Sequence, residues 1–219
     1  MKSRALKRKE RTAPAGLVMM LFGLTACGSS VTIPEPGDPP PVSGSQLLFL
    51  RPAANSLPLL TTDTSVVATR GQQLKLELFY APAEGQGGER GERFLRFELK
   101  QNTLLRYPQN HPRAGALFQT GDTITIRVHV AADTLLARFE PSGLQFNPDE
   151  PAQLELSYVE ADRDFDDDGQ DDPELEGQID LWRQEAAGQP WFRTGQIKDL
   201  ELDEIEALLT SFTRYALAI

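Results

Sequence analysis

The chain has 219 residues and a formal charge of −10, with 40% hydrophobic residues and a single cysteine. A chain this acidic repels nucleic-acid phosphates and anionic lipid head groups, so we expect no nucleic-acid partner. The basic residues gather at the start: residues 1–26 hold six Lys or Arg and one Glu, so the rest of the chain is still more acidic.

Residues 1–26 have the layout of a bacterial lipoprotein signal peptide. A basic region is followed by an apolar segment that is too short to span a bilayer. The segment ends at Ala26, directly before Cys27. An ordinary secretory cut after Ala26 is the alternative, but it would place bulky Leu24 where a small residue is preferred. We therefore expect Cys27 to carry a lipid such as palmitate, and the protein to be exported to the bacterial cell envelope.

The segment after the cysteine predicts a tether. Gly28 stands where Asp would retain a lipoprotein in the inner membrane, so resemblance to lipoproteins of double-membraned bacteria implies sorting to the outer membrane. Residues 27–46 contain five prolines and almost no large apolar side chains. Proline-rich chain prefers an extended conformation of about 3.1 Å per residue, so this tether can hold a domain on the order of 50 Å from the lipid.

From residue 47 onward, hydrophobicity alternates with a period of two residues, as in half-buried β-strands. Turn-forming residues separate four such runs, whose apolar sides are Leu74, Leu76, Leu78 and Tyr80; Leu95, Phe97 and Leu99; Ile124, Ile126, Val128 and Val130; and Leu154, Leu156 and Tyr158. Residues 47–219 are expected to form an all-β, antiparallel fold, and we favour a sandwich, of one or two subdomains, over a barrel. Residues 200–209 fit both helical and strand spacing.

Three motifs in the second half of the chain carry a family resemblance. Residues 142–146 read Ser-Gly-Leu-Gln-Phe, residues 151–158 read Pro-Ala-Gln-Leu-Glu-Leu-Ser-Tyr, and residues 211–218 read Ser-Phe-Thr-Arg-Tyr-Ala-Leu-Ala. They resemble motifs of the ZU5-like β-sandwich domains of bacterial surface proteins. The resemblance covers about residues 112–219 and departs at Ser211, where His is usual. It implies a strand at residues 205–209 and an interaction or structural module without a family active site.

An acidic segment at residues 160–176 contains the D-x-D-x-D-G spacing of calcium loops. Alternate side chains in a tight loop converge on one point, and calcium prefers several hard oxygen ligands. The expected ligands are the side chains of Asp164, Asp166, Asp168 and Asp172 and the carbonyl of Gln170. Leu175 stands where such loops usually have a bidentate Glu, so Glu174 or Glu176 would have to substitute. The alternative is a solvated acidic loop.

No catalytic pattern stands out, and we expect a protein that is not an enzyme. His111 and His129 lie outside the usual metal-binding and nucleophile motifs. A histidine beside a carboxylate in a cleft would instead favour an unrecognised hydrolase.

Large aromatic residues gather late in the chain, at Trp182, Trp191, Phe192 and Tyr215. They either fill the core or form a carbohydrate-binding platform, and the turn at residues 186–189 between the two tryptophans predicts a hairpin. Exposed neighbouring tryptophans would favour a carbohydrate- or peptidoglycan-binding lipoprotein. The sequence favours a lipid-anchored, non-catalytic structural or interaction module, with an envelope protein or a glycan as its partner.

Overall fold

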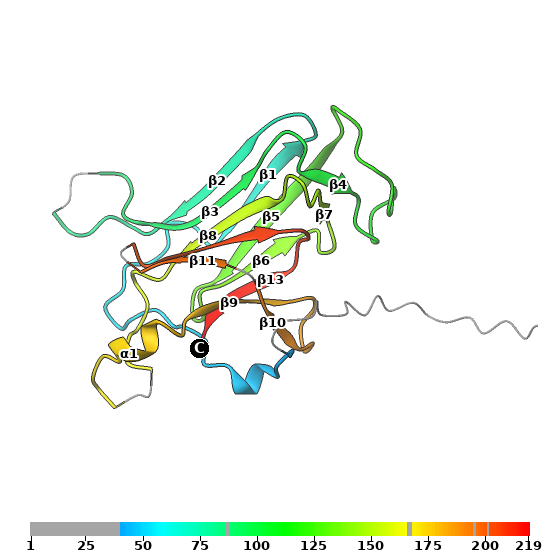
Figure 1. The fold of residues 1–219 in the computed structure, drawn as a ribbon. Helices are drawn as coiled ribbons and strands as arrows, with labels where there is room; N and C mark the ends of the chain where they lie inside the picture. Colours follow the sequence, from blue (N-terminus) through cyan, green and yellow to red (C-terminus); the bar gives the residue numbers. More distant parts are fainter. Residues whose placement is uncertain (1–39, 86–87, 166–167, 195, 201) are drawn as a thin grey trace, which may run out of the picture. The chain divides into compact units, whose positions relative to one another are not determined.

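The chain folds into antiparallel β-sheets (Figure 1). The computed structural model describes residues 40–85, 88–165, 168–194, 196–200 and 202–219. The expected signal peptide, Cys27 and most of the expected tether lie outside this part.

The larger sheet has six strands, in the order β1 (Asp63–Thr69), β5 (Thr123–Ala131), β6 (Leu136–Glu140), β13 (Arg214–Ala218), β9 (Asp180–Gln184) and β10 (Trp191–Arg193).

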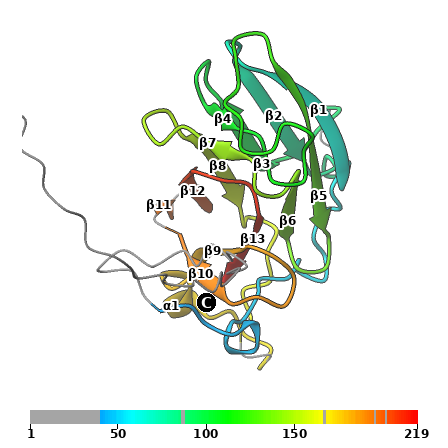
Figure 2. The ribbon, with the colours of Figure 1, turned by 90° about the vertical axis from the view of Figure 1, so that its right-hand side faces the viewer.

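The second sheet has five strands, in the order β11 (Gln196–Asp199), β12 (Glu204–Leu209), β8 (Ala152–Ser157), β3 (Arg93–Leu99) and β2 (Leu74–Phe79). A small third sheet pairs β4 (Leu104–Arg106) with β7 (Gln145–Phe146), and the described helices are η1 (Gly44–Gln46) and α1 (Pro173–Glu176). In Figure 2, β1, β5 and β6 lie to the right of β8 and β12. Neither described helix has the length and hydrophobicity needed to cross a membrane.

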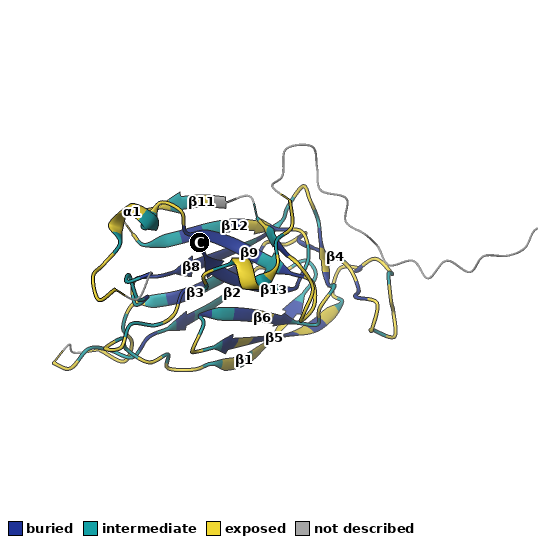
Figure 3. Ribbon diagram, turned by 90° about the horizontal axis from the view of Figure 1, so that it is seen from below, coloured by how far each residue is buried: buried dark blue, intermediate teal, exposed yellow. Residues whose placement is uncertain are grey.

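Aromatic side chains from both sheets meet in the core. Phe97 of β3 lies 5.3 Å, centroid to centroid, from Phe139 of β6 and equally far from Phe212, which precedes β13. All three rings are fully buried, and burial continues along most strands, as the dark blue ribbon of Figure 3 shows. The two sheets therefore pack face to face as a β-sandwich, which confirms the expected fold class.

The strands expected from alternation are present at β2, β3, β5 and β8. The segment that fitted both helix and strand spacing contains the strand β12, which pairs with β8 on one side and β11 on the other. Its alternate residues Ile205, Ala207 and Leu209 are buried, whereas Leu208 is exposed. The expected hairpin is also present, because β9 pairs with β10 in antiparallel register.

Contacts between the sandwich and the residues before 47 begin at Val42. Val42 exchanges two backbone hydrogen bonds with Trp191 of β10, and Leu48 exchanges two with Ile219. Between these points η1 crosses the outer face of the larger sheet, where a Cβ on Gly44 would lie only 3.1 Å from the Trp191 indole nitrogen. We name residues 42–49 the covering segment, since Val42, Leu47 and Phe49 pack against Trp182 and Trp191.

Candidate functional site

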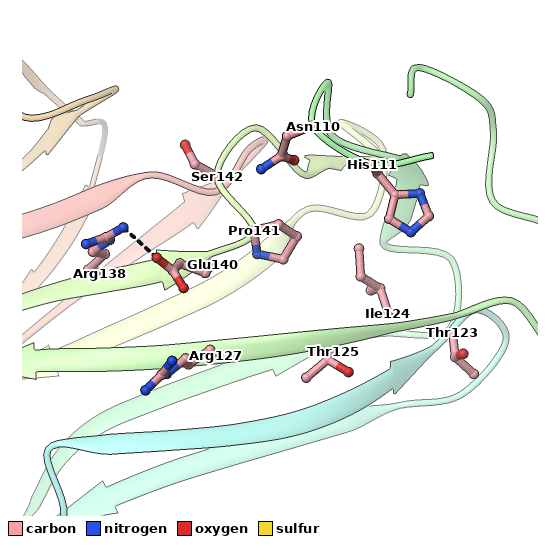
Figure 4. Close-up of a pocket in the computed structure, with 10 residues that line it drawn as sticks. All are labelled: Asn110, His111, Thr123, Ile124, Thr125, Arg127, Arg138, Glu140, Pro141 and Ser142. Atoms are coloured by element: carbon pink, nitrogen blue, oxygen red, sulfur yellow. Dashed lines mark hydrogen bonds and ion pairs between the residues drawn. The ribbon is translucent and has the colours of Figure 1, made fainter. Parts of the chain in front are cut away.

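A polar groove of about 700 Å³ crosses the part of the larger sheet's outer face that the covering segment leaves open. Strand alternation explains its floor, because β5 buries Ile126 and Val128 and turns Thr125 and Arg127 outward. We name it the outer-face groove; its lining is Asn110, His111, Thr123, Ile124, Thr125, Arg127, Arg138, Glu140, Pro141 and Ser142. Figure 4 shows that these residues come from three segments, the loop at residues 110–111, β5, and β6 with the turn after it.

Two ion pairs lie along the floor of the groove. Arg127 donates from Nε and Nη2 to the carboxylate of Asp63 on β1, at 2.9 and 2.6 Å, and these bonds lower the pKa of Asp63. On β6, Arg138 donates to Glu140, which the sheet register places opposite Arg127. All four side chains are about half exposed. Exposed pairs of this kind contribute little stability, so either guanidinium can exchange its partner for a ligand carboxylate.

The loop wall of the groove is held by stacked rings. Tyr107 stacks on His111 with centroids 4.4 Å apart and on Phe118 at 3.7 Å. Arg113 lies over the Tyr107 ring and pairs with Asp122 at 2.9 Å, and this bond lowers the pKa of Asp122 to about 2. His111 Nδ1 accepts a hydrogen bond from the backbone N–H of Arg113, so its Nε2 is the nitrogen free to face a ligand.

His129 also faces this side of the sheet, with Nδ1 3.7 Å from the Asp63 carboxylate. The two residues, with Arg127, Arg138 and Glu140, line a cavity of about 270 Å³ beside the groove. A histidine beside a carboxylate, here His129 beside Asp63, is the arrangement that would favour a hydrolase. Both Asp63 oxygens, however, already accept hydrogen bonds from Arg127. Within the described part of the chain, no hydroxyl group hydrogen-bonds to His129, whose polar contact is the one with Asp63.

The expected calcium loop is held by its own backbone. The Asp164 carboxylate accepts from the N–H groups of Asp168 and Gly169, at 3.0 and 2.8 Å. Asp168 accepts from Gln170, whose side chain is exposed, and Asp172 accepts from Phe165 at 2.8 Å. Leu175, at the position of the usual bidentate Glu, packs against the core.

Asp166 lies outside the described residues. The described residues contain no group of three or more His, Cys, Asp or Glu side chains placed to hold a metal ion. Calcium binding by this loop therefore stays a prediction.

We expect calcium to raise the melting temperature by several degrees. Neighbouring carboxylates repel one another, and a bound cation removes this repulsion. With a dissociation constant on the order of 10⁻⁴ to 10⁻³ M, a hundredfold excess would add roughly 2.7 kcal/mol to the free energy of unfolding. Calorimetry in calcium, magnesium and chelator measures the shift. Asp166→Ala with Asp168→Ala should abolish it, whereas Asp133→Ala with Asp149→Ala should not; identical curves in calcium and chelator would leave a solvated acidic loop.

The late aromatic residues do not form an exposed platform. Trp182 and Trp191 are 9% and 4% exposed beneath the covering segment, and Tyr215 is in the core. Phe192 is half-buried, with the Arg183 guanidinium 5.7 Å from its ring. The core interpretation therefore holds for three of these four residues, and a glycan could stack on none of the three.

Fold and groove together define the class of protein, an antiparallel β-sandwich with a polar groove on the outer face of one sheet. Comparisons with protein-family models, with curated proteins and with solved structures found no match. The resemblance to ZU5-like domains accordingly stays a prediction.

Proposed function

We propose that this protein is a lipid-anchored, non-catalytic interaction module of the bacterial cell envelope, and that its outer-face groove binds an acidic segment of an envelope protein. One observation carries the proposal. The outer face of the larger sheet is covered over β9, β10 and β13 but open and polar over β1, β5 and β6.

The groove favours a polypeptide over a glycan. Its floor presents two half-exposed guanidinium groups, which bind carboxylates with two parallel hydrogen bonds. Thr125, Ser142 and Asn110 add hydroxyl and amide groups that suit a peptide backbone. Among the described residues, the lining holds no Trp, Tyr or Phe on which a sugar ring could stack. A carbohydrate- or peptidoglycan-binding lipoprotein is the second candidate, and the same experiment separates the two.

Photo-crosslinking in intact cells tests the groove as a binding site. A photoreactive residue at Thr125, in the groove, should form adducts that the same residue at Lys75, on the opposite sheet, does not form. Protease digestion of the adduct identifies a protein partner, and digestion by a peptidoglycan hydrolase identifies a glycan.

Charge should control the yield of that crosslink. Arg127→Ala with Arg138→Ala should lower it about tenfold or more, because hydrogen bonds to charged groups are lost. Lys75→Ala with Arg96→Ala removes the same charge from the opposite sheet and should leave the yield unchanged. Equal adducts from both positions, or an unchanged yield in the groove variant, would contradict the proposal.

A further inference from the structure

A second cavity, separate from the outer-face groove, lies beneath the acidic loop. Its volume is about 160 Å³, close to that of cavities that hold a benzene molecule. It forms where the end of β8 meets residues 161–165 and α1. Most of its wall is apolar or aromatic, from Tyr158, Ala161, Phe165, Pro173 and Ile179. We name it the loop cavity.

The Tyr158 hydroxyl is the unusual feature of the loop cavity. The residue is 1% exposed, yet its hydroxyl oxygen has no hydrogen-bond partner among the residues that the structure describes. Burial, together with the negative charge of Glu176, raises the pKa of Tyr158 to about 12, so the hydroxyl keeps its proton at neutral pH. A buried polar group without a partner costs free energy, and a ligand that bonds to it removes that cost.

The remaining lining is negatively charged. Asp171, Asp172 and Glu176 contribute three carboxyl groups, whereas Arg163 is the one cationic residue among the described residues of the lining. Its guanidinium already donates to Glu176 at 3.2 Å and to Asp203 at 2.7 Å. An anion would therefore be repelled, whereas a cation with an apolar body matches both the charge and the walls.

We propose that the loop cavity binds a protonated alkyl amine. The alkyl chain lies against Phe165 and Ile179, and the ammonium group donates to the Tyr158 hydroxyl and to the acidic rim, which we define as the carboxylates of Asp171, Asp172 and Glu176. The alkylammonium group can belong to a free small amine or to a lysine side chain. The site is independent of the outer-face groove, because the two share no lining residue.

Calorimetric titration of the full-length protein in detergent, with chelator present, tests the site. n-Butylamine should bind about tenfold tighter than n-butanol, its neutral counterpart, since only the ammonium ion meets the acidic rim. Nα-acetyl-lysine methylamide separates the two sources: affinity equal to that of butylamine indicates a lysine side chain, and much weaker affinity indicates a free amine.

Two tyrosine variants test whether the bound amine contacts Tyr158. Tyr158→Phe keeps the ring and removes the hydroxyl, and it should weaken butylamine binding several-fold. Tyr80→Phe is the matched control, because the Tyr80 hydroxyl is equally buried and unpartnered but lies outside the cavity. Glu176→Gln should also weaken binding. Equal affinity for butylamine and butanol, absence of butylamine binding at millimolar concentration, or unchanged binding in Tyr158→Phe would overturn the proposal.

Discussion

Cys27→Ser is expected to move the protein from the membrane fraction to the soluble fraction and to remove the lipid mass from the intact chain. Serine lacks the thiol that carries the lipid. Each buried CH₂ group of an acyl chain contributes about 0.8 kcal/mol, so a palmitoyl-length chain contributes on the order of 10 kcal/mol to membrane binding. The acidic domain offers no compensating attraction to anionic lipid, so little binding should remain.

Fractionation and intact-mass spectrometry measure this effect together. Ser29→Ala, two residues further on, keeps the thiol and should behave as the wild type. The folded domain should be unchanged in both variants, because Val42 is the first residue of the covering segment to contact it. Wild-type protein that is soluble and carries no added mass would rule out the anchor.

Strand alternation predicts a strand best where one face is buried and the other meets solvent. In β5 every second residue is β-branched and buried, so the strand is evident from sequence alone. β1, its partner, has Val66 and Val67 side by side and only Ala68 fully buried, so the same pattern does not reveal it. An edge strand gains much of its structure from the hydrogen bonds of its neighbour, which no local pattern encodes.

The polar face of β5 in the outer-face groove could be predicted from the sequence, but its partners on other strands could not. Alternation in β5 places Thr125, Arg127 and His129 on one polar face, and the structure confirms this. It does not predict the Asp63 partner, since that pair joins residues 64 positions apart. The loop cavity could not be predicted from a local pattern either, because Tyr158 and residues of α1 line it together.

The burial of the two tryptophans also could not be predicted from the sequence around them. Whether they fill the core or form a platform depends on the covering segment, which begins within the proline-rich run assigned to the tether. Its apolar residues Leu47 and Phe49 are visible in the sequence, but the tryptophans that they cover, more than 130 residues away, are not.

Phe97→Ala is expected to lower the free energy of unfolding by about 3–5 kcal/mol, the usual cost of removing a buried phenylalanine ring from a core. Phe97 is 0% exposed and contacts the rings of Phe139, Phe146 and Phe212 at centroid distances of 5.3, 6.4 and 5.3 Å. Because Phe97 belongs to one sheet and Phe139 to the other, alanine leaves a cavity at the interface between the sheets.

Urea unfolding followed by tryptophan fluorescence measures the loss, since Trp182 and Trp191 are buried in the native state and become exposed on unfolding. Leu208→Ala on β12 of the same sheet is the control, because Leu208 is 60% exposed and should change stability by less than about 0.5 kcal/mol. Phe97→Leu keeps most of the apolar volume and should cost less than Phe97→Ala. A similar loss for Phe97→Ala and Leu208→Ala would mean that the aromatic cluster does not hold the two sheets together.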